Sequence, residues 1–246
     1  MFDTHFDLLF YIFMSRNNIQ KIKEYCSKIF RKDNITGGIF NFCYLSPEEM
    51  EQALNIKKEA INVIENLKLV NCLIQKHNII SQDTNYIIGI EGLDYLNEIE
   101  DIDELYKLGM RSTNIVWNNR NKFGGGAKSD EKDGLTNLGE ELVEKLVKTN
   151  IAIDLSHTNE KTFWGIIEQC KRLRKQGYIP IIHASHSNSK TICDVPRNLS
   201  DEQIKAIAEE FDGTIGIVGY TPFVVNAVGV AWHATRAAYH AAPTIS

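Results

Sequence analysis

Two short segments rich in β-branched residues, 151–157 and 179–186, each end in a histidine. The residues between them, 159–176, are typical of a helix. A strand, a crossover helix and a second strand predict two parallel neighbouring strands. His157 and His186 are then expected at the C-terminal ends of parallel strands, where α/β proteins build their active sites. Two imidazoles at that position favour a metal site.

The composition excludes several classes of protein. A chain of 246 residues is long enough for one large α/β domain, and a net charge of -5 without a basic cluster argues against a nucleic-acid partner. Five scattered cysteines without a CxxC pair argue against a disulfide framework or a cysteine zinc site. We find neither a signal-peptide pattern nor an apolar run of about 20 residues, so we expect a cytoplasmic protein that does not bind a membrane.

Strand-like and helical segments alternate along the chain. Capping boxes at Ser46–Glu49 and Ser200–Gln203 mark the beginnings of two of the helices. The alternation predicts a (β/α) barrel or a doubly wound sheet. The expected strands lie within 1–13, 36–45, 85–91, 111–117, 151–157, 179–186 and 213–219, and the expected helices within 18–33, 46–74, 102–108, 138–149, 159–176 and 200–211.

Two segments depart from this pattern. Residues 118–134 are polar, and we interpret them as a flexible loop at the rim of the fold, because their three consecutive glycines do not open a helix that could bind phosphate. From Ala227 to Ser246 the chain has seven alanines in twenty residues and no lysine. We therefore predict an incomplete barrel domain over 1–226 and an atypical tail over 227–246, which we hypothesise to come from a truncation, a frameshift or a fusion scar.

Polar residues gather at the predicted strand ends. Any one of these histidines alone would most simply be a hydrogen-bonded core residue, and the first strand could simply expose a polar face. Four histidines together with two carboxylates favour a metal instead, with zinc preferred and manganese or iron as alternatives. Glu91 lies between the two groups in strand order and could bridge two metals about 3.5–4 Å apart. The residues are His5, Asp7, Glu91, His157, His183 and His186.

Six short motifs stand out along the chain: Asp3-Thr-His-Phe-Asp7, Gly89-Ile-Glu-Gly92, Gly134-Leu-Thr-Asn-Leu-Gly139, Ile153-Asp-Leu-Ser-His157, Ser185-His-Ser-Asn-Ser189 and Pro196-Arg-Asn198. Their order resembles the renal-type membrane dipeptidase family, whose members are zinc hydrolases with an amidohydrolase-like barrel. The resemblance spans about residues 1–225. It implies a (β/α)8 TIM-barrel type of fold related to metal-dependent hydrolases, and we expect the eighth strand unit, with its metal-binding aspartate, to be missing from this chain.

The resemblance also implies roles for the metal ligands. His5 and Asp7 are expected to bind one zinc ion and His157 and His186 a second, with Glu91 bridging them. A water held between the metals is the expected nucleophile.

Other residues are expected to bind the substrate or to support the ligands. Arg197, with Asn198 beside it, is expected to hold the free carboxylate of the substrate, a task suited to a guanidinium. Trp117 replaces a histidine that many animal members place near the scissile carbonyl, so we predict a catalytic contact there. Asp154 and His183 are expected to support the ligands without binding metal.

The function that follows is a zinc-dependent dipeptidase, expected to hold two zinc ions, that hydrolyses small dipeptides with a free C-terminal carboxylate. The resemblance further suggests a homodimer. One alternative is another small-amide hydrolase on the same barrel, which would act on N-acyl amino acids or lactams. The other is an inactive truncated fragment that retains partial metal binding.

Overall fold

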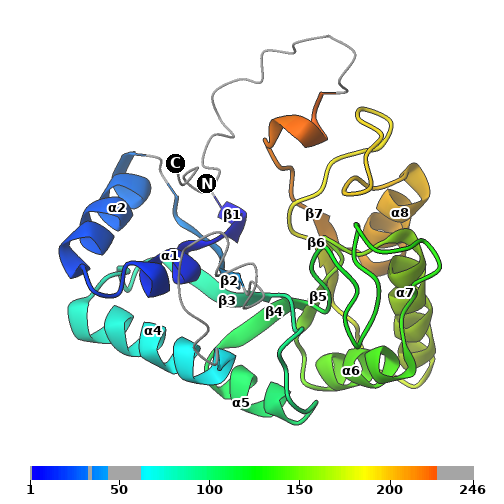
Figure 1. Cartoon of the computed structure of the whole chain (residues 1–246), viewed down its shortest axis with the longest axis horizontal. Helices are drawn as coiled ribbons and strands as arrows, with labels where there is room; N and C mark the ends of the chain where they lie inside the picture. Colours follow the sequence, from blue (N-terminus) through cyan, green and yellow to red (C-terminus); the bar gives the residue numbers. More distant parts are fainter. Residues whose placement is uncertain (1, 33–34, 44–61, 226–246) are drawn as a thin grey trace. The chain divides into compact units, whose positions relative to one another are not determined.

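The computed structural model describes residues 2–32, 35–43 and 62–225. The chain divides into two compact units, Met1–Ile115 and Val116–Ser246, which are described in turn (Figure 1). The described elements of the first unit are β1 (Phe2–Phe6), α1 (Leu8–Met14), α2 (Ile19–Lys32), β2 (Gly37–Cys43), α4 (Val63–His77), β3 (Asn85–Glu91), α5 (Asp101–Lys107) and β4 (Met110–Asn114).

The strands of the first unit are all parallel and lie in the order in which they occur in the chain, β1-β2-β3-β4. A doubly wound sheet would reverse its strand order partway across. The sequential order instead matches the winding of a (β/α) barrel. Cys43 pairs with Glu91 at the end of the β2–β3 ladder, so Glu91 occupies the C-terminal end of its strand as predicted.

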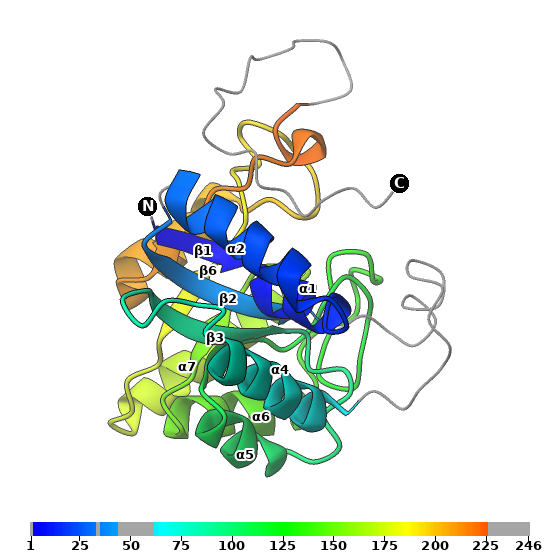
Figure 2. The same ribbon diagram turned by 90° about the vertical axis from the view of Figure 1, so that its left-hand side faces the viewer.

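Helices α1, α2 and α4 lie in front of β1, β2 and β3 in Figure 2. The core between these layers is aromatic. The Phe40 ring stacks on Tyr86 at 4.7 Å between centroids and meets the edge of Phe6 at 5.7 Å. Offset stacking and edge-to-face contacts are the favoured geometries of aromatic pairs. These rings join β1, β2 and β3, and Phe30 of α2 lies 5.9 Å from Phe40, which connects the strands to the helical layer.

The first strand predicted within 1–13 is longer than the strand in the structure. Strand β1 ends at Phe6, and Leu8–Met14 forms helix α1. The four buried residues of this helix, Leu8, Leu9, Ile12 and Phe13, follow helical rather than alternating spacing. The alternation of polar residues stops at Asp7, and the apolar run after it packs as a helix.

Helix α4 begins with a side-chain cap. The Asn62 carboxamide oxygen accepts hydrogen bonds from the backbone N–H groups of Ile64 and Glu65 at 3.0 and 3.2 Å. The capping box predicted at Ser46 and Glu49 lies outside the described residues, as does the tail predicted over 227–246.

The second unit repeats the alternation. Its strands are parallel and again follow chain order, β5-β6-β7. The capping box at Ser200 and Gln203 is confirmed, and α8 continues as a π-helical turn over Ala206–Glu210. The described elements are α6 (Asn137–Lys148), β5 (Ala152–Asp154), α7 (Glu160–Lys175), β6 (Ile182–Ala184), α8 (Asp201–Lys205), β7 (Thr214–Ile215) and a 3-10 turn at Thr221–Phe223.

The segment 118–134 differs from its prediction as a polar rim loop. Phe123 is only 1% exposed, and residues 124–127 are buried as well. The Gly125 N–H donates to the Thr162 hydroxyl at 2.8 Å, and Gly125 O accepts from Asn159 N–H at 3.1 Å. The glycine-rich centre of this segment, 123–127, is therefore buried against the start of α7, while charged residues on either side of it, such as Lys122, Lys128 and Lys132, remain exposed.

The described strands and helices form the (β/α)-barrel type of fold that the sequence predicts. None of the helices in the described ranges has the length and apolar character that crossing a bilayer requires.

Candidate metal sites

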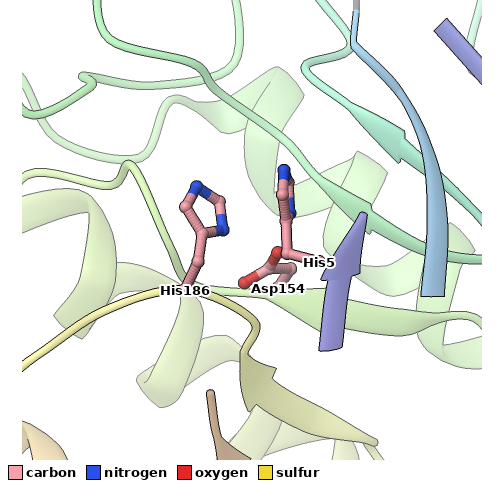
Figure 3. Close-up of side chains that lie close together, drawn as sticks. All are labelled: His5, Asp154 and His186. Carbon is pink, nitrogen blue, oxygen red and sulfur yellow. The ribbon is translucent and has the colours of Figure 1, made fainter. Parts of the chain in front are cut away.

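In the first unit, one histidine and two carboxylates converge at the C-terminal ends of β1 and β3. His5 Nε2 lies 3.4 Å from Asp7 Oδ1 and 3.5 Å from Glu91 Oε1. One ligand atom from each residue lies within 4.8 Å of the other two. Figure 3 shows His5, which comes from β1. The three residues form the cluster that the sequence predicts for this end of the sheet.

The ring of His5 is oriented by Asn41 on the neighbouring strand β2. Asn41 Nδ2 lies 2.9 Å from His5 Nδ1, which directs Nε2 toward the carboxylates. Gly89, the partner of Asn41 on β3, makes room for this side chain. A Cβ at position 89 would lie 1.8 Å from Asn41 Oδ1. The glycine in Gly89-Ile-Glu-Gly92 therefore supports the cluster indirectly.

One buried atom in this cluster points to a cation. Asp7 Oδ1 is buried and makes no hydrogen bond within the described residues, and its contact with the His5 imidazole is 3.4 Å long. A buried carboxylate oxygen without a hydrogen bond is costly unless a positive charge compensates it. One imidazole nitrogen and two carboxylates form a donor set that suits zinc and other divalent transition metals. The residues present therefore fit a metal ion.

In the second unit, the imidazoles of His157 and His186 face each other. Their Nε2 atoms are 2.8 Å apart, and the ring centroids are separated by 4.8 Å. His157 follows β5 and His186 follows β6, so both lie beyond the C-terminal ends of adjacent parallel strands. This arrangement agrees with the prediction from the two histidine-terminated segments.

His157 is held from three directions. Its Nδ1 lies 2.9 Å from Asn118 Oδ1, and its carbonyl accepts a hydrogen bond from Ala127 N–H at 2.8 Å. The Trp117 ring lies beside it, 5.7 Å between centroids at an interplanar angle of 30°. The backbone of His157 has φ 73°, a left-handed conformation that few residues other than glycine adopt. The 118–134 segment thus fixes the strained backbone of this candidate ligand.

Asp154 connects the two histidine-bearing loops. Its Oδ1 accepts from Ser156 N–H at 3.0 Å and from Ser185 N–H at 2.9 Å, and its Oδ2 accepts from the Ser185 hydroxyl. Burial alone would raise the pKa of Asp154, but positive charge on His183 and His186 and the hydrogen bonds from Ser185 hold it well below its usual range. The side chains of Asp154 and His186 lie next to each other in Figure 3.

Three further predicted residues lie in the second unit. His183 is the β6 partner of Asp154 in the strand register and is buried. The Arg197 guanidinium lies 5.3 Å from the centre of the Phe223 ring. Asn198 is 2% exposed, and its amide donates to Cys193 O and Phe223 O at 2.7 and 2.9 Å. Asn198 therefore anchors this loop, and its contact with a substrate stays a prediction, as does that of Arg197.

Three side chains that contact the candidate ligands have no role that the sequence alone predicts. These are Asn41, Asn118 and Ser185, which contact His5, His157 and His186 respectively. Ser185 and Asn118 each adjoin a predicted site residue, but adjacency in sequence does not reveal a contact. Asn41 lies mid-strand, and only the pairing of β1 with β2 brings it beside His5.

A family model described as membrane dipeptidase, peptidase family M19, matches residues 1–242. The chain is 34% identical over 138 residues to an uncharacterized protein in the PQQ-III 3′ region of Acinetobacter calcoaceticus, a match that covers 53% of this chain and 41% of the relative. The chain thus spans less than half the length of that relative.

Two solved structures share the fold at 21% identity. One is dipeptidase AC, a metallo peptidase of family M19, with a TM-score of 0.67 over 91% of this chain and 74% of that one. The other is a metallo peptidase from Rhodobacter sphaeroides bound to a phosphinate mimic of the dipeptide L-Ala-D-Ala, with a TM-score of 0.65 over 90% of this chain and 74% of that one. Since the family model spans nearly the whole sequence, the chain belongs to the membrane dipeptidase family, peptidase family M19.

Proposed function

We propose that this chain carries the catalytic residues of a zinc-dependent dipeptidase that hydrolyses the peptide bond of small dipeptides. The observation that carries the proposal is the cluster of His5, Asp7 and Glu91, in which the buried Asp7 Oδ1 has no hydrogen bond to any described residue. Membership of the membrane dipeptidase family supports the reaction class. The dipeptide mimic bound to the Rhodobacter sphaeroides relative supports a dipeptide-sized substrate.

Each unit supplies ligands in this proposal. His5, Asp7 and Glu91 would hold one metal ion, and His157 and His186 would bind a second. The family resemblance adds that Glu91 bridges the pair. When bound, the metal ions supply Lewis acidity, which polarises a carbonyl and lowers the pKa of water. Zinc is the metal we propose, because imidazole and carboxylate donors are its usual ligands in hydrolases.

The protein's own residues would position the substrate. Arg197 would hold the free carboxylate of the dipeptide through its guanidinium, which matches a carboxylate in two parallel hydrogen bonds. Trp117, packed beside His157, would form the wall next to the scissile bond.

The test is metal content together with hydrolysis by the full chain. Elemental analysis after dialysis is expected to find about two zinc ions per chain. Hydrolysis of L-Ala-D-Ala and L-Ala-L-Ala is expected to stop with a chelator and to return with Zn²⁺. His157→Ala is expected to lower both zinc content and turnover, whereas the matched control His77→Ala, at the end of α4, leaves the zinc content unchanged.

Other outcomes separate the alternatives. Turnover that survives complete removal of metal would overturn the proposal. Activity confined to N-acyl amino acids or lactams favours a different amide hydrolase on the same barrel. Full zinc occupancy without turnover of any amide favours an inactive chain that retains its metal sites.

A further inference from the structure

His186 has a partner at each ring nitrogen. Its Nε2 faces His157 Nε2 at 2.8 Å, and its Nδ1 lies 2.6 Å from the Ser185 hydroxyl oxygen. The same hydroxyl contacts Asp154 Oδ2. Asp154, Ser185 and His186 therefore form a continuous row of hydrogen bonds that ends at the candidate ligand atom.

The number of hydrogens available fixes the direction of this row. Asp154 accepts two backbone N–H groups at Oδ1, as an ionised carboxylate does. A serine hydroxyl has one hydrogen, and the carboxylate takes it. The oxygen of Ser185 can then only accept from His186, so Nδ1 of His186 must carry a hydrogen, and in the neutral ring Nε2 carries the lone pair.

We infer that Ser185 and Asp154 are positioning residues that fix the Nδ1–H tautomer of His186 and present its Nε2 as a metal ligand. The inference deepens the proposed function and rests on it where the metal is concerned. Partners of this kind orient metal-binding histidines and raise their basicity. Here a hydroxyl stands between the carboxylate and the imidazole, whereas such carboxylates more often contact the ring directly.

The neighbouring histidine has the matching arrangement. Asn118 Oδ1 lies 2.9 Å from His157 Nδ1, so the carboxamide oxygen accepts the ring hydrogen there too. Both Nε2 lone pairs then point at each other across 2.8 Å, which is repulsive until a cation lies between them. The pair is thus arranged around a positive charge.

The same three residue types occur in serine hydrolases, but in another order. There the imidazole stands between the carboxylate and a nucleophilic hydroxyl. Here the hydroxyl stands in the middle, and Ser185 is only 2% exposed. Its oxygen is occupied by Asp154 and His186, so the geometry favours a supporting role over nucleophilic attack.

The tautomers can be read directly from long-range ¹⁵N–¹H spectra of the metal-free full chain, with His186→Gln used to assign the His186 signals. The wild-type spectrum is expected to show Nδ1–H at His186. Ser185→Ala is expected to shift this population toward Nε2–H and to weaken Zn²⁺ binding by about 10–100-fold in a competition titration with a chromophoric chelator. Ser185→Thr, which keeps the hydroxyl, is expected to restore both.

Ser187→Ala is the matched control, because this buried serine of the same loop bonds to the Ser156 hydroxyl and not to the imidazole. It is expected to leave the His186 tautomer unchanged. Zinc binding with His186 as Nε2–H in the metal-free wild type overturns the positioning inference alone. The expected tautomer without any zinc binding overturns the proposed function alone. The wild-type spectrum decides the tautomer even if the alanine variant fails to fold.

Discussion

The backbone N–H of Ala127 donates a 2.8 Å hydrogen bond to the carbonyl of His157. This bond ties the glycine-rich segment to a candidate ligand whose φ of 73° is unfavourable for a side chain with a Cβ. Such a conformation persists only where the surroundings determine it. The bond and the Asn118 contact together supply that constraint.

Gly126, which precedes Ala127, allows the backbone to pass close to the carbonyl groups of Trp117 and Asn118. A Cβ at this position would lie 2.0 Å from Trp117 O and 2.5 Å from the Asn118 carbonyl carbon, and neither backbone atom can move away cheaply. Gly126→Ala is therefore expected to lower the free energy of unfolding by about 3 kcal/mol or more. Chemical denaturation of both proteins measures the difference.

The control for that substitution is Gly177→Ala. Gly177 has φ 94°, but no atom lies within 4 Å of a Cβ built there. Only backbone strain applies, so the expected loss is about 1–2 kcal/mol. Equal losses at positions 126 and 177 would contradict the steric argument.

Asn159 is expected to contribute more to stability than an ordinary helix cap. Its oxygen accepts from Thr162 N–H at 2.9 Å, and its amide nitrogen lies 2.7 Å from Asp133 O. Asn159→Ala loses both the helix cap and the hydrogen bond to the 118–134 segment, and we expect it to lower the free energy of unfolding by about 2–4 kcal/mol. Asn62→Ala, which removes the cap of α4, is expected to cost about 1 kcal/mol. Thermal unfolding of the two variants makes the comparison.

Asn159→Asp separates the two contributions. The carboxylate keeps the capping acceptor but cannot donate to Asp133 O. An intermediate loss is expected, and a stability equal to wild type would mean that the tie to the segment contributes nothing.

Metal is expected to stabilise the folded chain. Free Zn²⁺ at 100 times its Kd raises the free energy of unfolding by about 2.7 kcal/mol for one site. Asp7→Asn preserves the shape of the side chain but removes the negative charge of the carboxylate, whose Oδ1 has no hydrogen bond within the described residues. This variant is expected to unfold at nearly the same temperature with and without metal if the site at Asp7 accounts for most of the metal-induced rise in unfolding temperature. If metal raises the unfolding temperature of the variant as much as that of the wild type, metal binds elsewhere.

Two buried thiols predict an alkaline limit to stability. Burial raises the pKa of Cys26 and of Cys170 to about 12. Above about pH 9 the unfolded chain releases these protons while the folded chain keeps them, so the thiol contribution to stability is complete below pH 9 and is lost as the pH rises toward 12. The slope is about 1.4 kcal/mol per pH unit for each thiol. Cys170→Ala is expected to halve this slope in denaturation curves recorded between pH 9 and 11.

The same burial predicts selective alkylation. Cys72 is exposed, whereas Cys26, Cys43, Cys170 and Cys193 are buried. Iodoacetamide added to the native protein at pH 8 is expected to modify Cys72 first, because the thiolate is the reactive form and needs access. Peptide mass spectrometry locates the adduct. Rapid alkylation of Cys170 in the native state would contradict the packing of α7.

The sequence predicts the framework because its signals are local. Glu91 before Gly92, the Ser200 capping box and the histidines after β5 and β6 all follow from short-range patterns, and the structure confirms their placement. Except for β3, the strands are shorter than predicted: β5 covers only Ala152–Asp154. Beyond Asp154 the chain leaves the strand, and the Ser156 N–H donates to the Asp154 carboxylate.

What the sequence could not predict depends on long-range contacts. The apolar run after Asp7 fits a strand or a helix equally well until its packing is known. The segment 118–134 looks solvent-exposed because its composition is polar, yet residues 123–127 at its glycine-rich centre are buried. The contacts of Asn118 with His157 and of Asn41 with His5 join residues more than thirty positions apart, and no pattern in one sequence reveals them.

Asp154 accepts one backbone hydrogen bond from each histidine-bearing loop and a third hydrogen bond from the Ser185 hydroxyl. One carboxylate therefore sets both the path of the chain and the protonation of a candidate ligand. A mutational scan that scored only the amount of folded protein would place it with the apolar core. A scan that scored only turnover would place it with the ligands. Only the ratio of the two scores would distinguish Asp154 from a candidate ligand such as His186, whose loss should spare abundance and abolish activity.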